Sequence, residues 1–401
     1  MSVFSGKHIL LGVTGSIASY KAADVASKLA QAGARVDVLI TGAGEKFITP
    51  LTFQSVTGRR AYIEQDLWGN EAHVLHVSFG KTADLLVIAP CTAHTIAKLA
   101  HGLADNLLTV TALAAECPLV IAPAMDGGMY YHPTTQKNLA KLKEGGAIII
   151  GPADGHLASG LTGKGRMIEP AEIIGHLRII LGRNGKLAGK KIVVTAGGTQ
   201  EAIDPVRVIT NHSSGKQGYA LAQAALDSGA DVCLITAPTA LTPPVGARVI
   251  KVNSVQEMLN AVMRESADAL IMAAAAADFR PAQTAKDKLK KRDGIPQIKL
   301  EAAPDILKTV SDSQLGRKRF QVVVGFAAES RDLLENASEK LKSKHLDIIV
   351  ANDISASDAG FAVETNRVTL LFENGSKEIL PLMSKVEAAE KIMEHTARLL
   401  E

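Results

Sequence analysis

Aromatic residues are scarce in this chain of 401 residues, at 4% with one Trp and five Tyr. A base-stacking surface for single-stranded nucleic acid is therefore poorly supplied. Net charge is also low, because 44 Lys and Arg residues against 41 Asp and Glu residues leave a formal charge of +3. This balance argues against a polybasic surface, and the apolar share of 47% argues against disorder. We expect a globular protein without a nucleic-acid partner.

Cysteine is rarer still. Cys91, Cys117 and Cys233 form an odd set without paired metal spacing, which argues against a disulfide framework and against a zinc site. No apolar run approaches the roughly 18 residues of a membrane span, and the run near the N-terminus is too short for a secretory signal core. The sequence therefore predicts a cytoplasmic protein with no membrane partner.

What the chain does contain is a series of short apolar runs separated by segments with helical spacing. In the first half the runs cover residues 8–13, 36–40, 85–89, 119–122 and 148–150. Apolar strands without polar alternation indicate a parallel sheet that helices cover on both faces. The pattern breaks at residues 181–190 and then resumes. In the second half, residues 191–199 predict a strand followed by a loop, and residues 219–228 predict a helix. Further strands are predicted at 232–236, 270–275, 322–326 and 348–351. The fold class is α/β, with two doubly wound Rossmann-like domains.

Loops at the carboxyl ends of the first-half strands are candidate ligand sites. The small residues at 12–19 suit either a phosphate at a helix N-terminus or a plain strand-to-helix turn. The loops at 41–44 and 89–94 belong to the same predicted edge. His76, with His73 as a competitor, suits a general base, although most unaided histidines are structural.

Further candidates follow in both halves. Asp126 lies in a Pro- and Gly-rich loop, where its simplest role is a helix N-cap. The glycine-rich stretch at 155–167 suits a flap over a ligand or an ordinary surface loop. In the second half, residues 211–216 suit an anion cradle, although they are not a Walker A loop. Asp278 suits either a metal or a nucleotide hydroxyl, and the lysines of 286–291 suit a triphosphate, so together they favour a nucleotide.

In their order these motifs resemble a bifunctional flavoprotein family of coenzyme A biosynthesis, in which a phosphopantothenoylcysteine decarboxylase is joined to a phosphopantothenate–cysteine ligase. The resemblance covers nearly the whole chain. It is carried by residues 15–18, 76–81, 89–92, 104–107 and 123–125 in the first half, and by residues 195–199, 204–207, 211–218, 276–279, 288–291, 325–329 and 351–353 in the second.

The resemblance implies a flavodoxin-like FMN-dependent decarboxylase domain at residues 1–188 and a CTP-dependent ligase domain at residues 189–401. The implied small molecules are 4′-phosphopantothenate, cysteine, CTP with Mg²⁺ or Mn²⁺, and 4′-phosphopantothenoylcysteine, which is decarboxylated to 4′-phosphopantetheine. Oxidation of the substrate thiol by the flavin provides the electron sink for loss of CO₂. A large homo-oligomer, a dodecamer in this family, is implied as well.

The same resemblance assigns site residues. His76 matches the catalytic histidine of the decarboxylase. The FMN positions are Gly15, Ser16, Ile17, Ala18, Thr41, Ala89, Pro90, Cys91 and Thr92. In the ligase, Asn211 serves the acyl-cytidylate intermediate, Lys288 the triphosphate and Asp278 the nucleotide. The remaining CTP positions are Met272, Ala273, Ala274, Pro304, Asp305, Ile306, Leu307, Phe326, Lys340 and Lys344. No metal ligands are assigned.

Two positions depart from the family pattern. Asp126 occupies the place of an Asn that contacts the substrate carboxylate, and Ser159 that of a flap Cys that donates a proton. A hydroxyl is a far weaker acid than a thiol, so the protonation step is expected to be slower. A second hypothesis follows, in which the flavin domain is a scaffold with lost or altered decarboxylation. A nicotinamide oxidoreductase is a third hypothesis, and the lack of a GxGxxG motif disfavours it.

Overall fold

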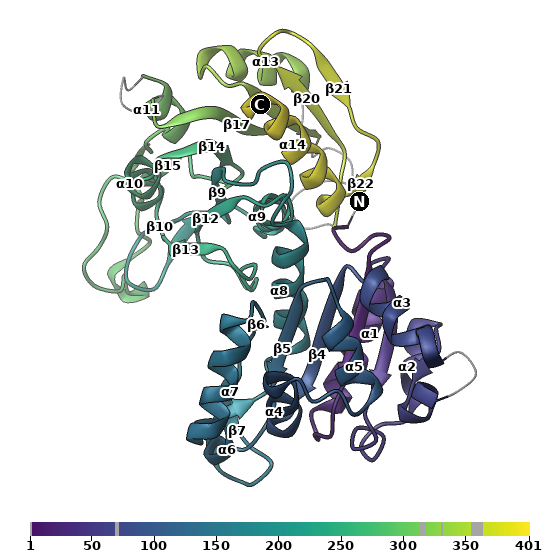
Figure 1. The fold of residues 1–401 in the computed structure, drawn as a ribbon. Coiled ribbons are helices and arrows are strands. Elements are labelled where there is room, and N and C mark those ends of the chain that lie inside the picture. The colour runs from purple at the N-terminus through teal and green to yellow at the C-terminus, as the bar shows by residue number, and fades with distance from the viewer. Residues whose placement is uncertain (1, 69–71, 313–317, 330–331, 354–363) are drawn as a thin grey trace. The chain divides into compact units, whose positions relative to one another are not determined.

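The structure, a computed structural model, describes residues 2–68, 72–312, 318–329, 332–353 and 364–401. The chain divides into two compact units, Met1–Leu181 and Gly182–Glu401 (Figure 1). Within the described residues, no helix has both the length and the apolar character that a membrane crossing requires.

The first unit is built on a six-stranded parallel sheet with the order β3-β2-β1-β4-β5-β6. Without the two-residue edge strand β3, this is the order of flavodoxin-like doubly wound sheets. Strands β1, β2, β4 and β5 are buried almost throughout, as their largely apolar sequences predict, and the buried positions include Asp37 of β2. The strands are β1 (His8–Val13), β2 (Arg35–Ile40), β3 (Ala61–Tyr62), β4 (Leu85–Cys91), β5 (Leu119–Pro123) and β6 (Ile148–Ile149).

Two apolar cores lie on the two faces of this sheet. One contains the buried sides of α1, α2 and α8, and the other those of α3, α4, α5 and α7. Helix α1 contributes its residues at helical spacing, Ala22, Val25, Ala26 and Leu29, as predicted. The helices are α1 (Ser19–Gln31), α2 (Pro50–Thr57), α3 (Ala72–Thr82), α4 (Ala93–His101), α5 (Leu107–Ala114), α6 (Gly127–Tyr131), α7 (Pro133–Glu144) and α8 (Pro170–Gly182), with a short 3₁₀ helix at Glu64–Trp68.

The glycine-rich stretch forms an antiparallel hairpin of β7 (Ala153–His156) and β8 (Thr162–Arg166). At Gly165 the φ angle is +151°, and a Cβ atom there would lie 2.3 Å from the carbonyl oxygen of Met125. The amide of Met125 also donates to the carbonyl oxygen of Gly165, with N and O 3.0 Å apart. The hairpin is thus held directly against the loop that follows β5.

The second unit has an eight-stranded sheet with the order β13-β12-β9-β14-β17-β18-β20-β21. The six strands from β13 to β18 are parallel, and the last two are antiparallel additions. The strands are β9 (Lys191–Ala196), β12 (Asp231–Thr236), β13 (Arg248–Lys251), β14 (Ala267–Met272), β17 (Phe320–Glu329), β18 (Ile348–Asp353), β20 (Val368–Phe372) and β21 (Lys377–Ile379).

Helices again cover both faces of this sheet. One core includes α9 and α14, and the other includes α10, α11 and α13. These helices are α9 (Lys216–Asp227), α10 (Val255–Arg264), α11 (Ile306–Asp312), α13 (Leu333–Ser343) and α14 (Lys385–Leu400), with a 3₁₀ turn at Lys291–Asp293. Three small antiparallel pairs lie apart from the main sheet, namely β10 (Gln200–Ala202) with β11 (Val208–Thr210), β15 (Phe279–Pro281) with β16 (Leu300–Ala302), and β19 (Thr365–Asn366) with β22 (Met383–Ser384).

The division between the units lies a few residues before the predicted limit at 188/189. Leu187 is fully buried in a core of the second unit, whereas the predicted limits assign it to the first domain. One predicted strand, at 270–275, is displaced by three residues toward the N-terminus. Strand β14 ends at Met272 rather than at Ala275, because the amide of Ala274 turns to the hydroxyl of Thr195, with N and Oγ1 3.1 Å apart.

Candidate functional sites

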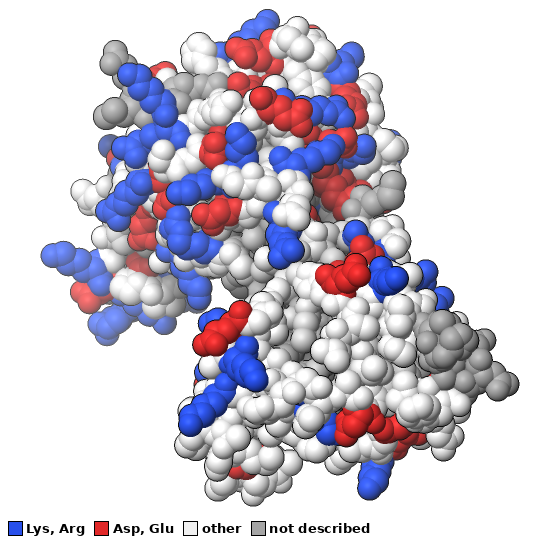
Figure 2. All heavy atoms as spheres, in the orientation of Figure 1, with Lys and Arg blue, Asp and Glu red and all other residues white. Residues whose placement is uncertain are grey.

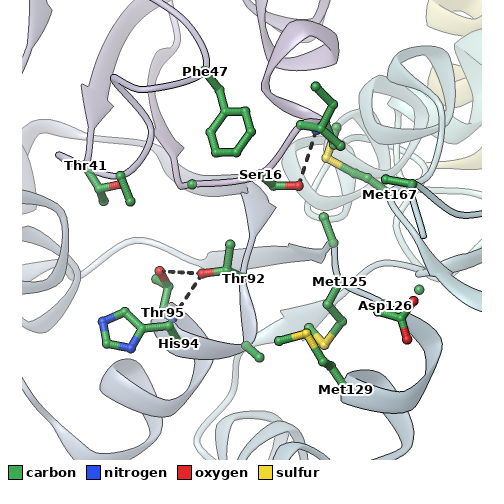
Figure 3. Close-up of a pocket in the computed structure, with 18 of the residues that line it drawn as sticks. Ser16, Thr41, Phe47, Thr92, His94, Thr95, Met125, Asp126, Met129 and Met167 are labelled. Carbon is green, nitrogen blue, oxygen red and sulfur yellow. Dashed lines mark hydrogen bonds between the residues drawn. The ribbon is translucent and has the colours of Figure 1, made fainter.

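A cavity of about 860 Å³ opens at the carboxyl ends of β1 and β4 in the first unit. The strand order reverses between these two strands, and this is where open α/β sheets bind their ligands. Figure 3 shows Ser16, Thr41, Phe47 and Thr92 around this space, with the Met125–Met129 segment on the other side. The predicted residues in its lining are Gly15, Ser16, Ile17, Ala18, Thr41, Thr92, Asp126 and Ser159.

The loop between β1 and α1 is shaped for close approach. A Cβ atom on Gly15 would lie 2.6 Å from the Cβ of Ala43, so glycine lets this loop lie directly against the 41–44 loop. Helix α1 begins without a side-chain cap and without an acidic residue in its first turn. Its N-terminal N–H groups and dipole therefore favour an anion such as a phosphate at this end of the cavity.

Hydrogen bonds of Thr14 hold the loop after β4 beside the loop between β1 and α1. The hydroxyl of Thr14 donates to the carbonyl oxygen of Pro90 at 2.7 Å and accepts from the amide of Thr92 at 3.1 Å. Thr92 then caps α4 by accepting from the amide of Thr95 at 3.3 Å. Ala89 and Cys91 are fully buried, and Ala89, Pro90 and Cys91 lie outside the cavity lining. They act on the cavity only through the loop that they support.

The two residues that depart from the family pattern contact each other. The hydroxyl of Ser159, in the turn of the β7–β8 hairpin, donates to Oδ2 of Asp126 at 2.6 Å. Asp126 is also the N-cap of α6, and its Oδ1 accepts from the amide of Gly128 at 2.9 Å. The hydrogen bonds from Ser159 and Gly128 hold the pKa of Asp126 below its ordinary value. Asp126 is therefore a carboxylate, and the Ser159 hydrogen is directed to it.

His76 lies on α3 and does not line this cavity. Its Nδ1 atom is buried and has no hydrogen-bond partner among the described residues. The side chain of His73, its competitor, lies outside the described part of the chain. The structure thus brings most of the predicted flavin positions together in one cavity. His76 of the same chain lies outside this cavity.

A second cavity, of about 550 Å³, lies in the second unit at the reversal of strand order between β9 and β14. The segment 272–278 and the start of α9 form much of its wall. The predicted residues that line it are Met272, Ala273, Ala274, Asp278, Pro304, Asp305, Ile306, Leu307, Phe326, Lys340 and Lys344. Asn211 and Lys288 are outside the lining.

Cationic groups in this second cavity are held by defined partners. Nζ of Lys344 lies 2.7 Å from Oδ2 of Asp305, and Nζ of Lys340 donates to the carbonyl oxygen of Phe326 at 2.9 Å. Burial raises the pKa of Asp305, but the amide of Lys308 and the charge of Lys344 outweigh it, so the pKa lies below its ordinary value. The cavity thus combines fixed ammonium groups with an ionised carboxylate.

Sequence reasoning missed part of the second cavity. Lys385 begins α14, is 6% exposed and lines the cavity, and burial and the neighbouring Lys216 lower its pKa. Asn366 is 3% exposed, and its Oδ1 has no partner among the described residues. These two residues come from a part of the chain far from the predicted motifs, and their burial leaves no local sequence signal. Lys216, by contrast, belongs to the predicted anion cradle.

Metal ligands are not pre-assembled. Within the described ranges, no group of three or more His, Cys, Asp or Glu residues is arranged to hold an ion. Mg²⁺ usually needs only one or two protein carboxylates when it is bound together with substrate phosphates. Asp278 and Asp305 are the carboxylates that line the second cavity.

Two family models match the chain. A model described as "Flavoprotein" matches residues 3–180, and one described as "DNA/pantothenate metabolism flavoprotein C-terminal domain" matches residues 187–400. The coenzyme A biosynthesis bifunctional protein CoaBC of Bacillus subtilis (strain 168) is 43% identical over 99% of this chain and 98% of its own length. The chain belongs to this family. The CoaBC protein of Mycobacterium tuberculosis (strain H37Rv) is 42% identical, over 97% of this chain and 96% of its own.

Solved structures cover each unit separately. The C-terminal domain of a CoaBC protein matches with 39% identity and a TM-score of 0.46, over 54% of this chain and 98% of its own. A PPC decarboxylase mutant complexed with pantothenoylaminoethenethiol matches with 34% identity and a TM-score of 0.40, over 43% of this chain and 97% of its own. The family matches confirm the predicted resemblance. They identify the chain as an enzyme of coenzyme A biosynthesis that contains a flavoprotein domain. The predicted doubly wound α/β fold class is also confirmed.

Proposed function

We propose that this enzyme joins cysteine to 4′-phosphopantothenate at the expense of CTP and then decarboxylates the 4′-phosphopantothenoylcysteine that it has formed. One observation carries the proposal. Each unit contains a cavity at its own reversal of strand order, and each cavity is lined by most of the residues that the family resemblance assigns to one of the two reactions. A family that pairs the two activities on one chain supports the same conclusion.

In the first unit, FMN is the proposed cofactor. The cavity fits FMN for two reasons. The Gly15 loop and the uncapped start of α1 are suited to the phosphate, and the cavity is large with a mostly apolar lining. FMN would supply the thiol oxidation that gives loss of CO₂ an electron sink. The β7–β8 hairpin, held against the loop after β5, would exclude water from the substrate. Asp126 and Ser159 would contact the substrate from this side.

In the second unit, CTP with Mg²⁺ or Mn²⁺ is the proposed co-substrate. Lys340 and Lys344 are held in place to neutralise phosphate charge, and the segment 272–278 forms a wall for the nucleotide. The chemistry is activation of a carboxylate as an acyl-cytidylate, release of pyrophosphate and attack by the amine of cysteine. Positioning and charge neutralisation supply most of the rate in such a reaction. Cytoplasmic location stays a prediction from the sequence.

A homo-oligomer, a dodecamer in the family, is part of the proposal. Ile17, Phe47 and Met129 line the first cavity and are each more than half exposed, a pattern typical of an interaction surface. On the face shown in Figure 2, the first unit is mostly uncharged, whereas charges of both signs are interspersed over the second. If His76 acts in the first cavity, it has to come from another copy of the chain, because it does not line the cavity of its own.

The deciding experiment is mass spectrometry of the products after the purified protein, supplied with FMN, meets 4′-phosphopantothenoylcysteine without CTP. We expect 4′-phosphopantetheine. A product lighter by about two mass units would mean that CO₂ loss survives and the final reduction fails. Unchanged substrate, together with CTP-dependent pyrophosphate release in a parallel assay, would favour the scaffold hypothesis for the flavin unit.

A further inference from the structure

Asp204 is a fully buried carboxylate in the second unit, outside both cavities. Its side chain is 0% exposed, and it lies in the turn between β10 and β11. A buried charge is costly unless its partners replace water. The hydrogen bonds of Asp204 therefore show what this carboxylate holds in place.

Four donors reach the two oxygens of Asp204. Oδ1 accepts from the amides of Val206 and Arg207, both at 2.8 Å. Oδ2 accepts from Nη1 of Arg207 at 3.0 Å and from the amide of Leu289 at 3.1 Å. Burial raises the pKa of Asp204, but the backbone donors Val206, Leu289 and Arg207 outweigh it and keep the pKa below its ordinary value.

The bond to Leu289 joins two segments that are far apart in sequence. Two further hydrogen bonds join the same segments. The amide of Ala285 donates to the carbonyl oxygen of Ile203 at 2.9 Å, and the hydroxyl of Thr284 donates to the carbonyl oxygen of Ala202 at 3.1 Å. Residues 284–289 are thereby laid along the β10–β11 hairpin. Leu289 directly follows Lys288, so the bond from Asp204 fixes the backbone beside this lysine.

The basic side chains beside this bond are exposed to solvent. Lys286 and Lys288 are exposed, and Ile295 is 97% exposed. Apolar burial therefore contributes little to its position, and directional hydrogen bonds must supply the order. A neutral amide at position 204 would turn an NH₂ group toward at least one of the N–H donors and leave it unsatisfied.

We propose that Asp204 is a positioning residue of the ligase, which holds the Lys288 segment so that the Lys288 ammonium is presented to the nucleotide triphosphate. The inference rests on the proposed function, and it takes from the family resemblance the assignment of Lys288, which lies outside the cavity lining, to the triphosphate. Asp204 itself contacts neither the cavity nor the nucleotide.

The test compares Asp204→Asn, Lys288→Gln and the double variant in full-length protein, with Asp231→Asn as the control at an exposed carboxylate of the same unit. CTP-dependent pyrophosphate release is expected to fall about 100-fold in each single variant, mainly in kcat. In the double variant the loss is expected to be no greater than in Lys288→Gln alone, because both changes remove the same contribution. CTP binding by calorimetry is expected to stay within about threefold, because the cavity groups are intact.

Amide hydrogen exchange gives a readout that does not depend on activity. In Asp204→Asn, residues 284–290 are expected to exchange faster, with the β12 and β14 core unchanged. Losses that multiply in the double variant, or unchanged exchange at 284–290, would overturn the inference while the proposed function stands. A wild-type protein that releases no pyrophosphate with CTP, 4′-phosphopantothenate and cysteine would overturn the proposed function itself.

Discussion

At the scale of single residues, Asp126 and Ser159, which both depart from the family pattern, contact each other, so the effect of one depends on the other. Because Ser159 donates to a carboxylate, its hydrogen is not directed at the substrate. A thiol at position 159 would face the same negative charge, which raises a thiol pKa and makes the thiol a weaker acid. The residue at 126 therefore controls what the residue at 159 can do.

We predict that Ser159→Cys alone changes decarboxylation little, whereas Asp126→Asn with Ser159→Cys speeds it. The reason is that the amide removes the charge beside the thiol. The combined effect is expected to exceed the product of the single effects by about threefold or more. Single-turnover formation of 4′-phosphopantetheine measures it. Asp154→Asn, an exposed change on the same hairpin, serves as the control and should combine with Ser159→Cys by simple multiplication.

Asp204 also predicts a pH dependence of stability. Its pKa is lowered in the folded state, so its contribution is complete above the unfolded pKa of about 3.9 and is lost as pH falls through the folded value. Asp204→Asn is therefore expected to lower the free energy of unfolding at pH 7, and the difference from wild type should shrink below about pH 4. Urea unfolding of both proteins from pH 7 to pH 3 measures this. A difference that is constant over this range would contradict an ionised Asp204.

Residue types and spacing predicted the cavity walls well, since the Gly15–Ala18 loop and the segment Met272–Ala274 lie where strand ends place them. Lys385 and Asn366 were not predictable, because a lysine at a helix start and an asparagine in a two-residue strand read as surface positions. Their burial arises from tertiary packing. The partnership of Asp126 with Ser159 was equally hidden, because it joins residues 33 positions apart through a hairpin.

At the scale of elements, the close approach of the β7–β8 hairpin to the loop after β5 depends on Gly165. Gly165→Ala would strain a φ of +151° and drive a Cβ into the carbonyl oxygen of Met125. We predict a loss of about 2 kcal/mol or more in the stability of the first unit, and weaker flavin retention. Gly163→Ala is the matched control, because its Cβ meets open space, and it should stay within about 0.5 kcal/mol. Denaturant unfolding and flavin absorbance per chain distinguish the two variants. Equal behaviour would mean that the hairpin is not held through Gly165.

At the scale of the whole molecule, each unit has its own two cores, and each cavity lies within one unit. Apolar periodicity predicted this organisation because parallel strands and covering helices are local patterns. Assembly of several copies is not encoded in this way. It depends on which exposed apolar surfaces of neighbouring copies meet, and local periodicity carries no signal for that pairing.

His76 provides the test of assembly. If it acts in the cavity of a neighbouring copy, His76→Asn protein and a cavity variant such as Gly15→Val should each be inactive as decarboxylases. Co-expressed, they should recover activity, because up to about a quarter of randomly assembled sites combine an intact His76 with an intact cavity. The measurement is CO₂ release by isolated mixed oligomers carrying two different tags. Pyrophosphate release, which depends on the other unit, controls for the amount of folded protein. Mixed oligomers without decarboxylation, beside an active wild type, would mean that His76 does not act across a contact between copies.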